Sequence, residues 1–267
     1  MKEFFGFGGY QREPEGYFSF EHILFVSILM VIMISLATII GKKNQNKDII
    51  EKNKVLIVAA LLIDGLELFK IILMCFRGND TLGWRYELPL FLCSIQLITI
   101  PLAAFSKGRI KEASLDFVMI FGILGAFFGT YFAGQNYGCY PVLSFDNVVS
   151  GITHSISGFC SLYIAISKMT SMKKENILIT NAILLSFCIL AYIANKLLDY
   201  NYMFLVRGDG TPYDIFYNLV NGNQIIYPLI VVILFFIYIL GFYYTYYFLT
   251  NRILKKKINL FVKNGQV

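Results

Sequence analysis

The chain has 267 residues, of which 57% are hydrophobic and only 15% are charged, and its mean hydropathy is +0.63. Soluble domains contain about 45–50% apolar and about 25% charged residues, and a soluble fold of this length cannot bury so much apolar surface. Soluble enzymes, disordered chains and nucleic-acid-binding proteins are therefore excluded, and the sequence predicts an integral membrane protein. The net charge of +6 has to be located along the chain before it can be interpreted.

Seven stretches have the length and apolar character of membrane-spanning helices, which need about 20 such residues. In chain order they cover residues 19–40, 55–76, 88–105, 115–133, 148–166, 177–198 and 225–249. The first is not typical of a signal peptide, because Glu3, Glu13 and Glu15 precede it and no small-residue cleavage site follows it. The connecting segments are short and polar. The sequence thus predicts an all-α membrane protein, with residues 1–267 forming a single bundle of seven transmembrane helices.

The basic residues predict the orientation of this bundle. Sixteen of the 23 Lys and Arg residues fall in three alternate connections and in the C-terminal segment, at 41–54, 107–111, 168–174 and 250–267. By the positive-inside rule these segments are cytoplasmic, so we expect the N-terminal segment, 1–18, to lie outside and the basic tail, 250–267, inside. An odd number of spans also places the two ends of the chain on opposite sides of the membrane, in agreement with this orientation. The basic loops are expected to contact anionic lipids rather than nucleic acid.

The five cysteines follow no metal-binding or C-x-x-C spacing, so we expect no metal and no cofactor. Cys75 and Cys139 both lie near the outer ends of predicted helices. Whether these two form a disulfide is left open by the sequence.

Ionisable groups inside a membrane are energetically costly, so those within the predicted spans are candidate functional residues. With a rise of 1.5 Å per residue, Cys93 and His154 each lie about 8–9 Å below the outer end of their helices. The other polar groups also fall in the outer half of the bilayer, which predicts one site there. The candidates are Cys93, His154, Glu67, Lys70, Asp64, Gln96, His22, Asn201 and Tyr202.

Purely structural interpretations remain open for several of these residues. Asp64, Glu67 and Lys70 share one helical face and would serve equally well as an intrahelical ion pair that holds the bundle together. His154 would serve as a structural hydrogen-bonding group and Cys93 as a small apolar filler. Two functions follow from these readings: a small-solute or proton-coupled transporter that uses Asp64, Glu67 and Lys70, or a structural or accessory membrane subunit.

Two motifs carry a resemblance to a known family. Residues 88–95, Leu-Pro-Leu-Phe-Leu-Cys-Ser-Ile, resemble the L-P-L-H-L-C-S-I signature of the YwaF-type bacterial integral membrane family. Residues 201–205, Asn-Tyr-Met-Phe-Leu, followed by Pro212, resemble its second motif, N-Y-M-F-L-x-x-K-P. Phe91 stands where the family has His, so the role of that histidine does not carry over. Residues 208–211 replace the family's lysine before the proline.

The YwaF-type family is similar to the vertebrate transmembrane protein 164 acyltransferase. This resemblance implies a multi-pass protein of the cell membrane that acts on membrane lipids, as a phospholipid acyltransferase or hydrolase. It implies Cys93 as the thiol nucleophile and His154 as its base, the Cys–His arrangement used in thiol acyl transfer.

The remaining candidates would support that pair or contact the substrate. Asn201, Asp199 or Glu67 would orient His154, and Gln96 or Asn201 would stabilise an oxyanion. Lys70, Tyr202 and His22 complete the supporting set. The acyl donor, the acceptor and the oligomeric state are left open.

Overall fold

The computed structural model describes residues 2–77, 83–170 and 172–263, with side chains described up to residue 250. The predicted basic tail, 250–267, therefore lies almost entirely outside the described side chains. The described residues form α-helices and short 3₁₀ helices, and no strand is found among them. In order, these are α1 (Phe20–Asn44), α2 (Ile49–Arg77), η1 (Gly83–Tyr86), α3 (Gln96–Phe105), α4 (Gly108–Tyr131), α5 (Gly134–Cys139), α6 (Phe145–Ile166), η2 (Lys174–Asn176), α7 (Ile177–Leu198), η3 (Tyr202–Phe204), α8 (Asp214–Leu219) and α9 (Ile226–Lys263).

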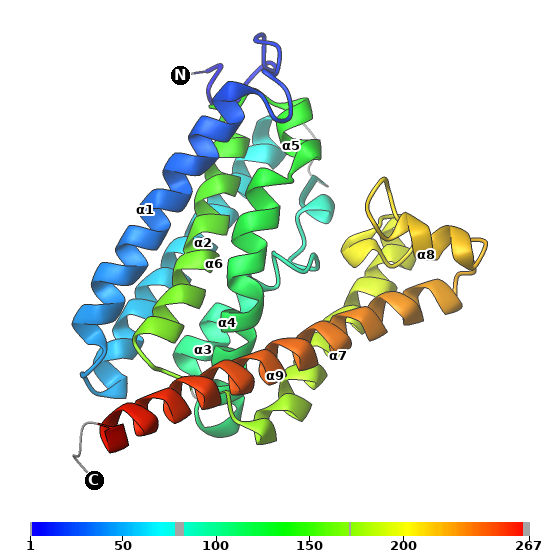
Figure 1. Cartoon of the computed structure of the whole chain (residues 1–267). Coiled ribbons are helices and arrows are strands. Elements are labelled where there is room, and N and C mark those ends of the chain that lie inside the picture. Colours follow the sequence, from blue (N-terminus) through cyan, green and yellow to red (C-terminus); the bar gives the residue numbers. More distant parts are fainter. Residues whose placement is uncertain (1, 78–82, 171, 264–267) are drawn as a thin grey trace.

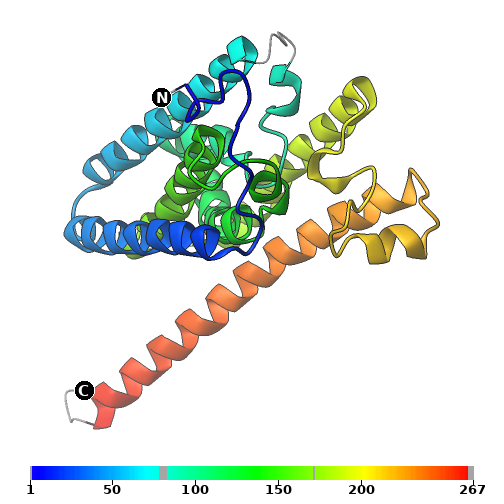
Figure 2. The same cartoon turned by 90° about the horizontal axis from the view of Figure 1, so that it is seen from above.

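Helix α4 is the centre of the main bundle. It packs most extensively against α6 and α3, while α1 and α2 complete the bundle by packing on α6 and α3 (Figure 1). The side chains of Phe117, Ile120 and Phe121 on α4 are almost fully buried, as is Tyr163 on α6. Helices α7, α8 and α9 form a second group beside this bundle (Figure 2), in which α9 crosses α7 (Figure 1) and α7 contacts α4.

Five segments of the described chain are long and apolar enough to cross a membrane: α1, Gly108–Cys139, α6, Lys174–Leu198 and Ile226–Thr250. The prediction of an all-helical, multi-pass membrane protein is confirmed. The count of seven spans is not, for two reasons. Helix α2 is long enough, but its apolar stretch contains Asp64, Glu67 and Lys70. Helix α3 has only 10 residues, about 15 Å of helix.

The predicted helix at 88–105 is wrong over residues 88–95, where the chain forms bends and turns before α3 begins at Gln96. Pro89 explains the late start, because proline cannot donate a backbone hydrogen bond and its ring pushes Leu88 out of the helical region. Ser94 then supports the turn locally, since its Oγ accepts a hydrogen bond from the Phe91 N–H at 3.0 Å. A broken helix therefore replaces the expected continuous one.

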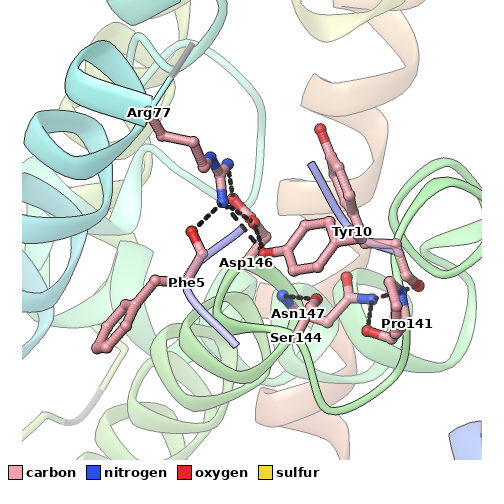
Figure 3. A network of polar contacts seen from close by, with 8 residues as sticks. Phe5, Tyr10, Arg77, Pro141, Ser144, Asp146 and Asn147 are labelled. Carbon is pink, nitrogen blue, oxygen red and sulfur yellow. Dashed lines mark hydrogen bonds and ion pairs between the residues drawn. The ribbon is translucent and has the colours of Figure 1, made fainter. Parts of the chain in front are cut away.

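The N-terminal segment and α5 lie at one end of the bundle, and the connections α1–α2, α3–α4 and α6–α7 lie at the other (Figure 1). This alternation agrees with the predicted one, while the side of the membrane that each end faces stays a prediction. Arg77 fastens the N-terminal segment to the first of these ends, as Figure 3 shows. Its guanidinium makes a bidentate ion pair with Asp146 at 2.6 and 2.8 Å and also donates to the Phe5 carbonyl and the Tyr10 hydroxyl.

The opposite end is held by a buried carboxylate that the sequence reading did not single out. Asp116 on α4 is fully buried and accepts hydrogen bonds from Asn176 Nδ2 at 2.9 Å and from Tyr243 Oη at 2.8 Å. Thr170 donates to the same carboxylate. Asp116 thus joins α4 to α9 and to the connection before α7.

Candidate functional site

Cys93 lies in the turn that leads into α3, and its side chain is half-buried. Its sulfur lies beside the backbone N–H groups of Cys93 and Ser94. Among the described residues, no oxygen accepts a hydrogen bond from the N–H of Leu92, Cys93 or Ser94. Because the start of a helix offers unpaired N–H groups and a positive dipole end, this turn has the properties of an anion-binding site next to a thiol.

His154 lies on α6, and Cys93 and His154 both pack against glycines of α4. A side-chain carbon added at Gly125 would lie 3.4 Å from Cys93 Cβ, and one added at Gly129 would overlap the His154 ring. Residues four apart on a helix face the same side, with Cβ positions about 5–6 Å apart. Cys93 and His154 therefore lie over consecutive turns of one face of α4.

The thiol and the imidazole are not bonded to each other. No hydrogen bond joins Cys93 to His154, and neither ring nitrogen of His154 bonds to any residue that the structure describes. The charge of Lys70 acts on both groups. The pairing of Cys93 with His154 stays a prediction.

Gln96 places an unpaired hydrogen-bond donor one turn after Cys93. Its side chain is fully buried, and its Oε1 accepts a hydrogen bond from Thr99 Oγ1 at 3.1 Å. Its Nε2 has no partner. An unpaired buried donor costs about 1–3 kcal/mol, so this amide is free to bind an oxygen that enters the site.

Glu67 and Lys70 belong to a buried ion-pair network with Glu87. The Lys70 ammonium lies 2.6 Å from Glu67 Oε1 and 2.8 Å from Glu87 Oε2. The sequence reading missed the role of Glu87, because its partner, Lys70, lies on another helix. Asp64, one turn before Glu67, does not join this network, and its buried Oδ1 has no partner.

The two family-like motifs pack against each other. The Phe91 ring contacts the Tyr202 ring at a centroid distance of 5.1 Å, and the Tyr202 hydroxyl donates to the Arg85 carbonyl. Asn201 uses both its amide oxygen and its amide nitrogen within the loop 201–209, bonding to Val206, Arg207 and Asp209. These bonds fill the hydrogen-bonding capacity of Asn201 and give it a loop-forming role rather than contact with His154.

His22 lies in the first turn of α1 and is fully buried. Its Nδ1 accepts a hydrogen bond from the Phe18 N–H at 3.1 Å, and its Nε2 donates to the Thr130 carbonyl at 3.0 Å. Both ring nitrogens are therefore engaged in tying α1 to the end of α4, and a contact of His22 with a substrate stays a prediction.

All five cysteines are free thiols, including Cys75 and Cys139. Among the described residues, no group of three His, Cys, Asp or Glu side chains is placed to hold a metal ion.

Comparison with known proteins gives one match. The family model of the TMEM164 family matches residues 17–246, which include Cys93, Gln96, His154 and both motifs. No curated protein matches the chain, and no solved structure matches it. Because the family model covers most of its length, the chain belongs to the TMEM164 family.

Proposed function

We propose that this protein is a membrane-embedded lipid acyltransferase or hydrolase in which Cys93 is the nucleophile and His154 the base. The observation that carries the proposal is the placement of both residues over consecutive turns of one face of α4. The N–H groups at 92–94, which have no oxygen partner among the described residues, and the free Gln96 amide support it further. Membership of the TMEM164 family is compatible with such an enzyme.

The first half-reaction is attack on a lipid ester. His154 takes the proton of the Cys93 thiol, either after a side-chain rotation or through one water, and the thiolate sulfur bonds to the ester carbonyl carbon. The oxyanion that forms accepts hydrogen bonds from the N–H groups at 92–94 and from Gln96 Nε2. The carbon–oxygen bond then breaks, and the departing lysolipid oxygen takes the proton from His154.

The second half-reaction releases the acyl group. His154 removes a proton from the hydroxyl of an acceptor lipid or from water, and that oxygen attacks the thioester. The carbon–sulfur bond breaks, the Cys93 thiolate leaves, and the proton on His154 returns to the sulfur. A lipid acceptor makes the protein an acyltransferase, and water makes it a hydrolase. With the predicted orientation, the site faces the outer leaflet of the cell membrane.

The test uses the full chain, purified and reconstituted into phospholipid vesicles with an alkyne-tagged acyl ester as donor. We expect covalent labelling and acyl transfer in the wild type, none in Cys93→Ala, and a loss of about 10²–10⁴-fold in His154→Gln. Cys188→Ala, which removes a buried thiol that lies beside Met203, is the matched control and should label normally. Undiminished labelling of Cys93→Ala would show that the nucleophile is wrongly assigned.

A transporter remains the second candidate, and the unpaired buried Oδ1 of Asp64 is the observation that favours it. The ion pairs of Glu67 and Lys70 count against it, because both charges are already bound to protein partners. A transporter predicts that Asp64→Asn or Glu67→Gln abolishes uptake while Cys93→Ala has no effect. A purely accessory subunit predicts that all three substitutions change only stability or assembly.

A further inference from the structure

The segment that carries Cys93 has little regular structure of its own. Between η1 and α3, residues 87–95 form bends and turns, so their position depends on contacts with other elements. The inner end of α3 is well fixed, because Lys111 Nζ donates to the Ala103 carbonyl at 2.7 Å and Asn53 Nδ2 donates to the Ala104 carbonyl at 2.7 Å. The outer end of the segment needs a separate attachment.

The ion pair between Lys70 and Glu87 supplies that attachment. Glu87 lies six residues before Cys93, and its carboxylate reaches the Lys70 ammonium of α2 at 2.8 Å. Lys70 is itself held on α2 by Glu67, one turn earlier, at 2.6 Å. The Lys70 and Glu67 side chains are only 10% and 12% exposed. Removing one partner of a buried ion pair is costly because it leaves a charge without compensation.

We propose that Lys70 is a positioning residue that binds Glu87 and thereby holds Cys93 against Gly125 of α4. Only the catalytic consequence rests on the proposed function, since the placement of the thiol is measurable without it. Loss of the ion pair loosens the outer end of the segment 87–95, which then keeps the contacts of Phe91 and Arg85 with Tyr202. The Cys93 side chain then spends less time over Gly125, one turn of α4 before the glycine that faces His154.

The structure offers a direct reporter of this placement. A side-chain carbon at position 125 lies 3.4 Å from Cys93 Cβ, close to the separation of about 3.5–4.5 Å found in disulfides. In a full-length chain with Cys75, Cys139, Cys160 and Cys188 replaced by alanine, Gly125→Cys should cross-link to Cys93 upon mild oxidation with copper phenanthroline. The chain is then denatured and treated with maleimide, and its intact mass is measured. The cross-linked chain carries no maleimide adduct, whereas the chain without the cross-link carries two.

In this background we expect Lys70→Met to slow cross-linking by about tenfold, which corresponds to about 1.4 kcal/mol. Glu87→Gln should act in the same direction while it leaves the Lys70–Glu67 pair intact, so it carries the test if Lys70→Met does not fold. The exchange of Lys70→Glu with Glu87→Lys, made together with Glu67→Gln so that no two carboxylates meet on α2, should return the rate to within about threefold of the parent, less than 1 kcal/mol. Lys54→Met, which breaks the exposed Lys54–Glu51 pair, is the control and should change nothing.

Unchanged cross-linking in folded Lys70→Met or Glu87→Gln overturns the proposal, as does failure of the exchanged pair to restore the rate. Absence of the cross-link in the parent overturns the placement of Cys93 itself. Acyl labelling measured in the same ion-pair variants, with Gly125 and the other cysteines intact, should fall in parallel with cross-linking. If cross-linking depends on Lys70 but no variant and no wild-type protein transfers acyl groups, the positioning role stands and the proposed function fails.

Discussion

Gly129→Ala is the sharpest single perturbation of the proposed site. The added methyl carbon would lie 2.3 Å from His154 Cε1, whereas ordinary contact begins at 3.4 Å, so the ring has to move by about 1.1 Å. Overpacking of this kind costs about 1–3 kcal/mol of stability. A misplacement of about 1 Å in a catalytic group costs about 10²-fold in rate, so we expect acyl labelling of Cys93 to fall by roughly that factor.

The assay compares labelling rates with thermal unfolding in detergent for three alanine variants. Gly125→Ala is the matched control on the same face, because its methyl carbon would make a contact of 3.4 Å with Cys93 Cβ and displace nothing. Gly65→Ala on α2 has nothing within 4 Å and controls for helix propensity alone. Wild-type labelling in a folded Gly129→Ala protein would refute the catalytic role of His154.

Three further predictions concern the surroundings of the site. Asp116→Ala should lower the free energy of unfolding by about 3 kcal/mol, because the donors from Asn176 and Tyr243 lose their buried acceptor; thermal unfolding of the detergent-solubilised protein checks this. Burial alone would raise the pKa of Glu15, but the hydrogen bond from the Val142 N–H and the nearby Arg12 lower it below the ordinary value of 4.5. The ionised carboxylate therefore stabilises the folded state above pH 4.5, and this contribution is lost as the pH falls through the lowered pKa. Proteolysis of the N-terminal segment should therefore become faster below pH 4.5 in the wild type, and its rate should vary less with pH in Glu15→Gln. Phe91→His should change the rate of Cys93 labelling by less than about threefold relative to the wild type, which is less than 1 kcal/mol, because residue 91 packs on Tyr202 while Cys93 packs on Gly125. A tenfold faster labelling would show that an imidazole at position 91 activates the thiol.

The helical membrane architecture was predictable because hydrophobic length is a strong signal. The segments around α1, α4, α6, α7 and α9 were all anticipated, with differences at their ends. The prediction of a helix over residues 88–95 failed for a local reason. Leu-Pro-Leu-Phe-Leu is as hydrophobic as a membrane-spanning helix, so hydropathy alone predicts a helix there. Only the geometry of Pro89 and the Ser94 turn distinguishes the two conformations. Apolar composition identifies the surroundings of a segment better than its backbone path.

The residues of the proposed site were named from the sequence, and their membership of one site stays a prediction, but their contacts could not be anticipated. Cys93 and His154 were named from polarity and resemblance, yet α4, the element that both contact, contributes only glycines at the point of contact. The spacing Gly125-x-x-x-Gly129 was a usable signal, because small residues four apart allow close helix approach in membranes. The roles of Glu87 and Asp116 depend on long-range partners, at positions 70 and 243, that no local pattern reveals.

The glycine face of α4 by itself would be explained by packing. Gly122, Gly125 and Gly129 lie along one face, and each glycine inside a helix costs about 1 kcal/mol relative to alanine, a cost that close helix approach offsets. A seam built only for packing would need small or apolar groups opposite all three glycines. Gly122 meets Ser157 and Ser161 and Gly125 meets a cysteine, all of them small as packing requires, but Gly129 meets the ring of a histidine. One turn after that cysteine, the side-chain amide nitrogen of Gln96 is buried and has no partner among the described residues. An unpaired buried donor weakens a fold, and under the proposed function an oxygen of the substrate accepts a hydrogen bond from this amide.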